Sequence, residues 1–361
     1  MKSIRVLQIG SDRSRRGILF PHTQAAKRQQ AYAELFGSVD IIAFSRRADG
    51  TQPYILDELR VYPTNSPNKL LYGWDAWHIL RSIPKPNIIS VQDPFETGLL
   101  GLLFSKVVQV PLLVQVHTDF LSTEYRKSSL LNRLRALIAP FVLRRATRIR
   151  VVSDRIRDSL QAAGCGLQAI TVLPMFVPTE LFKNAVVPEE LARKFALFTH
   201  RLLFVGRFEP EKNAALALES FAQSAPQNAC LIMVGDGSDR TRLERIAYDV
   251  GVKDRVFFEG LTDAAPYYQL ADLLLVTSRY EGFGVVIIEA LASGTPVLST
   301  DVGIAREAGA LVSAPESYAR SLQEWFKDGA RTGTLAPGFN VSADTHMKLF
   351  KDHVEQAAAH N

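Results

Sequence analysis

One stretch, residues 278–300, constrains the fold of this chain more than any other. Its sequence, SRYEGFGVVIIEALASGTPVLST, predicts a turn that contains glycine, a helix over 285–292 and a strand that begins at Val297. The apolar run just before it, residues 273–276, is typical of a buried parallel strand. Strand, loop, helix and strand in this order are the repeating unit of an α/β fold with a parallel sheet.

Two carboxylates flank the start of this helix. Glu281 lies in the turn, and Glu289 follows about one turn into the helix. The first N–H groups of a helix lack partners within it, and the positive end of its dipole attracts anions. Phosphate groups at these amides and hydroxyl groups at the two carboxylates together describe a nucleotide sugar as the ligand.

The length of 361 residues predicts two domains of ordinary size, each with its own core. Its formal charge of +5 favours an anionic ligand, an anionic membrane surface or nucleic acid, without choosing among them. The two cysteines, Cys165 and Cys230, are far apart and lack the spacing of a metal site. We therefore expect two reduced thiols in a cytosolic protein.

Two apolar stretches raise the question of membrane insertion. The N-terminal one is short and contains Arg5 and Gln8, so it predicts a first strand and not a signal peptide. The stretch over residues 98–116 is long enough to cross a membrane, but polar residues and Pro111 divide it. We expect a helix over 98–108, a strand over 111–116 and no transmembrane helix.

The first half alternates strands and helices, with strands expected over 4–9 and 54–62 and Trp74 and Trp77 expected in the core. The loop over 10–21 has one interior glycine, Gly17, and three arginines that are either solvated or face a ligand: Arg13, Arg15 and Arg16. His117 follows a predicted buried strand, and active-site loops gather at such strand ends. A structural and a functional role for His117 are both open at this point.

Residues 125–150 are the most basic part of the chain, with these cations: Arg126, Lys127, Arg133, Arg135, Arg144, Arg145, Arg148 and Arg150. Between them, apolar residues recur at helical spacing: Leu130, Leu131, Leu134, Leu137, Ile138, Phe141 and Val142. A basic amphipathic helix can make peripheral contact with an anionic membrane. We favour the other alternative, a helix that packs its apolar side on the sheet and leaves its basic side in water.

The second half begins a new α/β cycle with a strand over 202–205. Gly206 and Arg207 follow it directly, and Lys212 precedes the next helix. Both cations could reach a diphosphate at this edge, where the Arg fork engages two oxygens and Lys acts as a point charge. The spacing of a P-loop is missing.

The motifs in this half resemble those of the family 4 (group 1) glycosyltransferases of the GT-B fold, which are retaining enzymes that use nucleotide sugars. The resemblance covers nearly the whole chain and rests on four motifs: G-R-x-x-x-x-K-N at 206–213, Gly-Asp-Gly at 235–237, E-G-F-G-x-x-x-x-E at 281–289, and E-A-x-A-x-G-x-P-V through Val297. It implies two Rossmann-like parallel-sheet domains that face a central cleft. These would be an acceptor-side domain over 1–195 and a donor-binding domain over 196–330, with a C-terminal helix over 340–361 packed back on the first.

Carried over position by position, the resemblance implies catalytic roles for His117, Arg207, Lys212 and Glu281. Arg207 and Lys212 would bind the donor diphosphate and stabilise the leaving phosphate. Glu281 would hold the sugar, Glu289 the ribose, and His117 would lie near the transferred sugar. The implied donor-binding residues are Gly17, Gly206, Arg207, Lys212, Gly235, Gly260, Glu281, Gly282, Phe283, Gly284, Val285 and Glu289.

The implied activity is transfer of a hexosyl group from a UDP- or GDP-sugar, with retention of configuration and without a metal or another cofactor. The acceptor would be a glycan, a lipid-linked sugar or a small molecule, with no nucleic acid as partner. The donor phosphate itself would draw the proton from the acceptor. We expect a cytoplasmic protein, with peripheral contact to the inner membrane face as an option for residues 125–150.

Three departures from the family pattern motivate an alternative function, although an active enzyme is favoured because the core donor-binding residues remain. Gly17 stands alone where the family often has a double glycine, Met175 and its neighbours replace P-N-G-V-D, and Ile304 replaces a second glycine after Gly303. Each change removes backbone freedom or a polar group beside the expected site. The alternative is a GT-B protein that binds a nucleotide or a partner without transfer, and a GT-B epimerase is a third interpretation.

Overall fold

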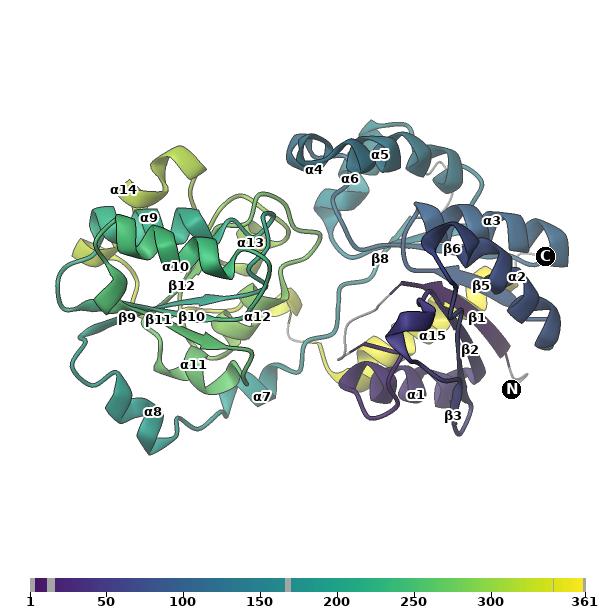
Figure 1. Cartoon of the computed structure of the whole chain (residues 1–361), viewed down its shortest axis with the longest axis horizontal. Coiled ribbons are helices and arrows are strands. Elements are labelled where there is room, and N and C mark those ends of the chain that lie inside the picture. Colours follow the sequence, from purple (N-terminus) through teal and green to yellow (C-terminus); the bar gives the residue numbers. More distant parts are fainter. Residues whose placement is uncertain (1–3, 12–16, 166–169, 340, 360–361) are drawn as a thin grey trace. The chain divides into compact units, whose positions relative to one another are not determined.

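The computed structural model describes residues 4–11, 17–165, 170–339 and 341–359 (Figure 1). The chain divides into two compact units. Unit 1 comprises Met1–Pro174 together with Asp344–Asn361, and unit 2 comprises Met175–Ala343. Each unit is a parallel sheet with helices packed on it, which confirms the predicted fold class of two parallel-sheet α/β domains.

The sheet of unit 1 has the order β3-β4-β2-β1-β5-β6-β7-β8 among the described residues. Its strands are β1 (Ile4–Gly10), β2 (Gly37–Ala43), β3 (Tyr54–Leu56), β4 (Leu59–Pro63), β5 (Ile88–Val91), β6 (Leu112–Val116), β7 (Arg148–Val151) and β8 (Ile170–Val172). All neighbours pair in parallel except β3 with β4. The central strands are buried throughout, because helices cover both faces of a parallel sheet.

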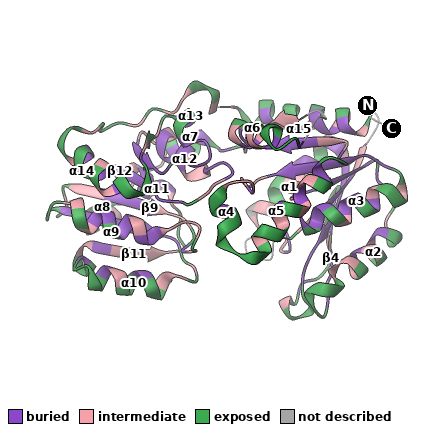
Figure 2. Ribbon diagram, turned by 90° about the horizontal axis from the view of Figure 1, so that it is seen from above, coloured by how far each residue is buried: buried purple, intermediate pink, exposed green. Residues whose placement is uncertain are grey.

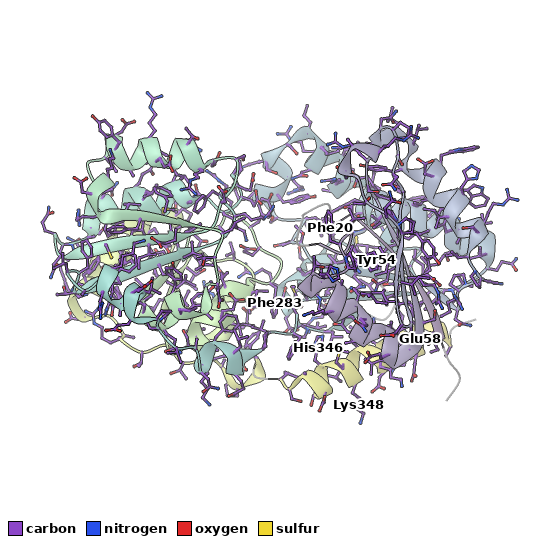
Figure 3. All side chains as sticks on the ribbon, turned by 60° about the horizontal axis from the view of Figure 1, so that its bottom comes forward. Phe20, Tyr54, Glu58, Phe283, His346 and Lys348 are labelled. Carbon is purple, nitrogen blue, oxygen red and sulfur yellow. The ribbon has the colours of Figure 1, made fainter. Side chains whose placement is uncertain are left out.

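The helices of unit 1 are α1 (Gln24–Phe36), α2 (Tyr72–Ser82), α3 (Glu96–Val108), α4 (Thr123–Ser128), α5 (Leu130–Leu143), α6 (Asp154–Ala162) and α15 (Ala343–Ala358), with short 3-10 helices η1 (Arg47–Asp49) and η2 (Lys69–Leu71). α15 packs on α1, and the Phe350 ring lies 4.6 Å from that of Tyr32 and 5.9 Å from that of Phe36. Figure 3 labels His346 on this helix, together with Phe20 and Tyr54, which pack against the hydrophobic core that β1, β2, α1 and α15 share.

The first unit ends at Pro174, about twenty residues before the predicted boundary at 195. The reason is that α7 (Thr179–Lys183) and α8 (Glu189–Lys194) pack within unit 2. The Phe182 ring meets that of Tyr268 edge-on at 5.7 Å, and the Phe195 ring meets that of Phe257 at 5.1 Å. These aromatic contacts fix the connecting segment to the second sheet.

Two other expectations for the first half are wrong. The predicted strand over 54–62 is an antiparallel hairpin, and Asp57 adopts φ 48° at its turn, a left-handed conformation that polar residues tolerate. Trp74 is not in the core, since 63% of its surface is exposed. Its neighbour Trp77 is partly buried, with its ring 5.8 Å from that of Phe104.

Helix α5 also differs from the favoured interpretation of the basic segment. Leu130, Leu134 and Leu137 are 80%, 52% and 76% exposed, and Figure 2 shows the corresponding stretch of exposed ribbon. The prediction that its apolar side packs on the sheet is therefore wrong. The helix instead buries a narrow face of mostly small residues: Ala136, Ala139, Val142 and Leu143. Five of its large apolar side chains, Leu130, Leu131, Leu134, Leu137 and Phe141, are exposed, and so is Arg133.

The sheet of unit 2 has the order β11-β10-β9-β12-β13-β14, and all its neighbours pair in parallel. Its strands are β9 (His200–Val205), β10 (Ala229–Val234), β11 (Val256–Gly260), β12 (Leu273–Val276), β13 (Val297–Ser299) and β14 (Leu311–Val312). Its further helices are α9 (Ala214–Ser224), α10 (Arg240–Asp249), α11 (Ala265–Leu270), α12 (Val285–Ala292), α13 (Ala305–Ala308) and α14 (Tyr318–Asp328), with η3 (Lys253–Arg255), η4 (Pro315–Ser317) and η5 (Pro337–Phe339).

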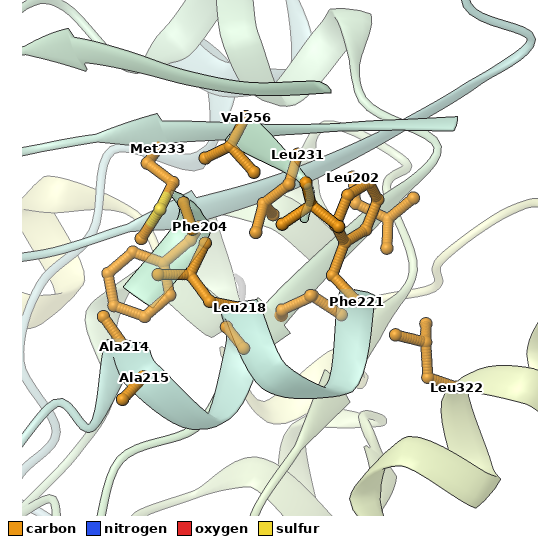
Figure 4. Close-up of a cluster of buried hydrophobic side chains, with 14 of the residues drawn as sticks. Leu202, Phe204, Ala214, Ala215, Leu218, Phe221, Leu231, Met233, Val256 and Leu322 are labelled. Atoms are coloured by element: carbon orange, nitrogen blue, oxygen red, sulfur yellow. The ribbon is translucent and has the colours of Figure 1, made fainter. Parts of the chain in front are cut away.

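The core of unit 2 lies between the sheet and α9. Phe204 and Met233 from the strands interdigitate with Leu218 and Phe221 from α9, as Figure 4 shows. Burial of each side chain of this size contributes about 1.5–3 kcal/mol to folding. This packing holds β9 rigidly, so the loop that follows β9 starts from a fixed position.

In each sheet the order of the parallel strands reverses its direction once. The reversal lies between β1 and β5 in unit 1 and between β9 and β12 in unit 2. Loops that follow the strands on either side of such a point leave in opposite directions and open a crevice, which is where ligands bind in open α/β sheets. No helix in the described part of the chain is long and apolar enough to cross a membrane.

Candidate functional site

The crevice in unit 2 is bridged by an ion pair between the two loops that border it. Lys212, from the loop after β9, places its Nζ atom 2.5 Å from Oε1 of Glu281, from the loop after β12. Ser278 donates its hydroxyl to the same oxygen at 2.7 Å. Both partners are largely buried, at 23% and 13% exposure of their side chains. The predicted phosphate-binding lysine and the predicted sugar-binding carboxylate therefore lie side by side.

The two loops are tied together below this pair. Thr277, which follows β12 and is fully buried, donates its hydroxyl to the carbonyl oxygens of Lys212 at 3.1 Å and Asn213 at 3.0 Å. Asn213 adopts φ 50° just before α9. Asn213 ends the G-R-x-x-x-x-K-N motif, whereas Thr277 was not singled out in the sequence, because a Thr after a strand is an ordinary turn residue.

Arg207 lies at the same edge but is far more open. Its side chain is 69% exposed and pairs with Glu211 at 2.7 Å. A surface pair of this kind contributes little to stability. Arg207 is therefore able to leave Glu211 for a stronger anion, whereas Lys212 holds its place in the crevice.

The glycines of residues 282–284 shape the start of α12. Gly284 precedes the helix with φ 93°, a conformation open to glycine, and it has no side chain to cap the first turn. Amides at the start of α12 are therefore available to an anionic group. Phe283 is buried, and the amide of Ile304 donates to its carbonyl oxygen at 3.0 Å. This contact supports the loop from the side of Gly303.

Gly303 is required by this arrangement. Its φ is 51°, and a Cβ atom at this position would lie 2.2 Å from the carbonyl oxygen of Phe283. The second position of the family's double glycine is Ile304, which is buried in unit 2. The substitution is accommodated because Ile304 adopts φ −100°, a conformation open to any residue, so no glycine is needed there.

Glu289 is held by a partner that the sequence did not reveal. The hydroxyl group of Tyr268, a fully buried residue of α11, donates to Glu289 Oε2 at 2.7 Å. Burial raises the pKa of Glu289, the hydrogen bond from Tyr268 lowers it, and the charge of Asp263 raises it. A tyrosine in a short helix is typical of a core residue, so no signal in the sequence pointed to this role.

Three predicted glycines meet at the other side of the crevice. The amide of Gly235 donates to the carbonyl oxygen of Gly260 at 2.8 Å. Gly235 adopts φ 146°, and a Cβ atom there would lie 1.9 Å from the carbonyl oxygen of Gly206. The loops after β9 and β10 and the end of β11 therefore pack backbone against backbone.

The remaining predicted residues belong to unit 1. His117 directly follows β6, and its Nε2 atom is buried without a hydrogen-bond partner in the described part of the structure. Burial, followed by the charges of Arg150 and Arg28, lowers the pKa of His117 to about 3. Gly17 accepts a hydrogen bond from the Thr23 hydroxyl at 3.0 Å before α1. Arg13, Arg15 and Arg16 lie outside the described residues.

Two family models match the chain, one in each unit. The model "Glycosyl transferases group 1" matches residues 199–328, and the model "Glycosyl transferase 4-like domain" matches residues 22–175. The match in unit 2 contains both strands of its reversal, β9 and β12, whereas the match in unit 1 begins after β1.

Curated relatives include 2-deoxystreptamine glucosyltransferase from Streptomyces kanamyceticus, which is 30% identical over 61% of this chain and 62% of its own length. Alpha-monoglucosyldiacylglycerol synthase from Streptococcus pneumoniae is 27% identical over 59% of this chain and 51% of its own length. The chain thus spans between about half and two thirds of these relatives.

Solved structures with the same fold cover nearly the whole chain. Anabaena Alr3699/HepE in complex with UDP and glucose has a TM-score of 0.74 at 18% identity and covers 99% of both chains. Sucrose-phosphate synthase from Thermosynechococcus elongatus has a TM-score of 0.73 at 21% identity and covers 99% of this chain and 96% of its own. At these identities the likeness shows the fold alone.

Proposed function

The chain belongs to the group 1 glycosyltransferases of the GT-B fold, and we propose that it transfers a hexosyl group from a UDP- or GDP-sugar to an acceptor hydroxyl. The observation that carries this proposal is the Lys212–Glu281 pair at the strand reversal of unit 2, beside the glycine-capped start of α12. One ligand with phosphate and hydroxyl groups satisfies all three features. The UDP and glucose of the Anabaena structure support a donor of this class.

The donor diphosphate would be held by three kinds of positive group. Lys212 supplies a partly buried charge, Arg207 an exposed fork that engages two oxygens, and α12 the amides of its first turn. Glu281 would accept hydrogen bonds from the sugar hydroxyls, and Glu289 from the ribose. The paired backbone segments at Gly235 and Gly260 would border the base.

In the transfer step the bond between the anomeric carbon and the oxygen of the distal phosphate breaks. The acceptor oxygen forms the new bond to that carbon on the same face, and its proton passes to the leaving phosphate. The products are a nucleoside diphosphate and the glycosylated acceptor. Lys212, Arg207 and the α12 amides stabilise the negative charge that develops on the phosphate. This step uses no nucleophile from the protein and no metal.

His117 would contact the transferred sugar as a neutral group. With a pKa of about 3, its imidazole carries no charge near neutral pH. Its buried Nε2 atom can therefore exchange a hydrogen bond with a sugar hydroxyl, but it cannot supply a positive charge to the phosphate.

A lipid-linked acceptor at an anionic membrane surface fits the exposed side of α5. Leu130, Leu134 and Leu137 face solvent, and exposed cations lie around them: Arg126, Lys127, Arg133, Arg144 and Arg145. Apolar side chains can enter the interface between headgroups and acyl chains, while cations bind the anionic headgroups. The basic segment thus supports peripheral contact of unit 1 with a membrane.

Calorimetric titration with UDP, GDP and ADP tests the donor site. We expect one nucleotide to bind, and Arg207→Ala/Lys212→Ala to weaken it at least about tenfold, because two charge-assisted contacts are lost. The control is Arg320→Ala/Lys327→Ala, which removes two charges from α14, outside the crevice. Failure of all three nucleotides to bind would contradict the proposal.

A second measurement distinguishes sugar transfer from nucleotide binding alone. Release of nucleoside diphosphate from the donor sugar, followed with a panel of acceptors, reports transfer. Glu281→Ala is expected to abolish that release. Tight binding without transfer to any acceptor would favour the alternative of a protein that binds a nucleotide without catalysis.

A further inference from the structure

Two adjoining cavities open at the strand reversal of the unit 1 sheet. The larger has a volume of about 690 Å³ and the smaller about 290 Å³. Ser11 and Asp93 line both of them. Ser11 directly follows β1, and Asp93 comes two residues after β5, so the cavities meet at the point where this fold places its ligands.

The larger cavity is mainly apolar. Phe44, Tyr72, Leu99, Leu103 and Leu131 line it, from the end of β2, from α2, from α3 and from α5. The rings of Phe44 and Tyr72 stack at 5.0 Å and form one wall. Cavities of this size bind small organic ligands. The lining favours a hydrocarbon group.

The smaller cavity is lined by polar side chains of a different kind. Gln8, Gln29 and Gln92 contribute amide groups, and Arg28 contributes a guanidinium. The Oε1 atom of Gln29 is buried and has no hydrogen-bond partner among the described residues. A buried acceptor of this kind requires a donor, and a sugar hydroxyl provides one. Amides together with the Asp93 carboxylate are groups that bind hydroxyls.

Two of the apolar side chains that line the larger cavity are also exposed at the surface. Leu103 of α3 is 53% exposed and Leu131 of α5 is 50% exposed. Arg135 of α5 lines the same cavity and pairs with Glu96 of α3 at 2.9 Å, which fixes the two helices relative to each other. The exposed leucines of α5 thus continue the apolar lining onto the surface.

We propose that these two cavities bind the acceptor and that the acceptor is a glycolipid-type amphiphile, with its sugar headgroup in the polar cavity and its hydrocarbon chain in the apolar one. This inference rests on the proposed transferase function and names the acceptor class. The reacting hydroxyl would lie toward Ser11 and Asp93, where the two cavities join at the carboxyl edge of the sheet. A water-soluble sugar without a chain would fill only the smaller cavity.

The test uses dodecyl maltoside, kept below its micelle-forming concentration, and maltose as the same headgroup without a chain. We expect saturable binding of one dodecyl maltoside per chain by calorimetry, at least about tenfold tighter than maltose, because each methylene group buried raises affinity about fourfold. Equal affinity of the two probes, or no binding of dodecyl maltoside, would overturn the proposal.

A matched pair of variants on α3 locates the site. Leu103→Glu places a carboxylate in the larger cavity, whereas Val107→Glu places one at a similarly exposed position, 51%, on the same helix but outside the lining. We expect Leu103→Glu to lower the affinity for dodecyl maltoside at least about tenfold and Val107→Glu to leave that affinity unchanged. Equal weakening by both variants would show unspecific adsorption and overturn the assignment.

Two further measurements separate this inference from the proposed function. Gln29→Leu is expected to weaken the binding of dodecyl maltoside several-fold. An unchanged affinity would show that the headgroup does not bind in the smaller cavity, and it would overturn the proposal. Nucleotide binding is measured on the same samples. A protein that binds UDP or GDP but not dodecyl maltoside contradicts only the acceptor class. A protein that binds none of the nucleotides contradicts the transferase function itself.

Discussion

The hydroxyl group of Tyr268 lies 2.7 Å from Oε2 of Glu289 and donates to it from the fully buried helix α11. Glu289 is itself largely buried, and its pKa is raised chiefly by that burial. The hydrogen bond therefore both orients the carboxylate and favours its charged form, which is the form that accepts hydrogen bonds from a ribose diol.

Tyr268→Phe is expected to weaken nucleotide binding about fivefold to tenfold, which corresponds to one lost hydrogen bond to a charged group. It should raise the KM for the donor and leave kcat nearly unchanged, because Tyr268 acts through Glu289. The control is Tyr267→Phe, which removes a hydroxyl that donates to Glu259 at 2.9 Å from the adjacent position. Equal effects of the two variants on donor affinity would contradict a positioning role for Tyr268.

Gly303→Ala should destabilise unit 2 by forcing the Phe283 loop to move. The new methyl group would lie 2.2 Å from the Phe283 carbonyl oxygen, in addition to the backbone strain of φ 51°. Gly294→Ala isolates the strain, because Gly294 has φ 86° and no heavy atom lies within 4 Å of the place that its Cβ atom would take. We expect a cost of about 1–2 kcal/mol for Gly294→Ala and a clearly larger one for Gly303→Ala. Urea denaturation measures both.

If Gly303→Ala proved no more costly than Gly294→Ala, the loop would be free to shift without loss of stability. The same variant is expected to lower nucleotide affinity, since the loop that moves includes the residues before α12. Gly294→Ala, which lies at the other end of that helix, should leave the affinity unchanged.

Acid should destabilise unit 1 through its buried histidines. The pKa values of His346 and His353 are each lowered to about 4, by burial first and then by the charge of Arg150, with Arg148 also acting on His353. The unfolded chain takes up protons near pH 6.5, whereas the folded chain resists them down to about pH 4. Stability should therefore be full above about pH 7 and should fall as the pH drops toward 4.

His353→Leu tests this pH dependence. Neither ring nitrogen of His353 has a hydrogen-bond partner within the described residues, so leucine loses no hydrogen bond there. We expect the variant to be more stable than the wild type at pH 5, and by a smaller margin at pH 8, in thermal melts. His22→Leu, at an exposed position, should have the same stability as the wild type at both pH values. An unchanged pH profile in His353→Leu would exclude this residue as a cause.

Membrane contact through α5 is tested by sedimentation with vesicles that contain phosphatidylglycerol. Leu134→Glu/Leu137→Glu is expected to lower vesicle binding at least about tenfold, because two interfacial side chains are replaced by anions. The control is Leu197→Glu/Leu261→Glu, which changes two exposed leucines of unit 2, 90% and 60% accessible. Equal vesicle binding by the two double variants would contradict contact through α5. Salt should weaken the wild-type binding, since the surrounding arginines contribute through charge.

The sequence allowed the second half to be predicted closely, because its signals are local. Helix α12 has the bounds that were predicted from the glycines before it and the Ser-Gly-Thr-Pro run after it. Apolar runs predicted the buried strands of both sheets for the same reason. Gly206, Lys212 and Glu281 were placed correctly at strand ends, because a glycine or a charge shortly after an apolar run marks the point where a buried strand stops.

Most of the failures concern contacts between residues that are distant in the sequence. Tyr268 and Thr277 support the site through partners far along the chain, and no local pattern reveals such pairs. The leucines of α5 repeat at helical spacing in the sequence whether they face the sheet or the solvent. The hairpin at Asp57 was missed because its turn lacks glycine and proline, which are the usual turn signals.

The core of unit 1 includes Phe350, Val354 and Ala357 of α15 together with residues of β1 and β2. All of unit 2 lies between these two sets in the sequence. During synthesis on the ribosome, β1 therefore emerges first but waits for α15, whereas the whole of unit 2 is already available to fold. The half of the protein that is made first is the half whose core is completed last.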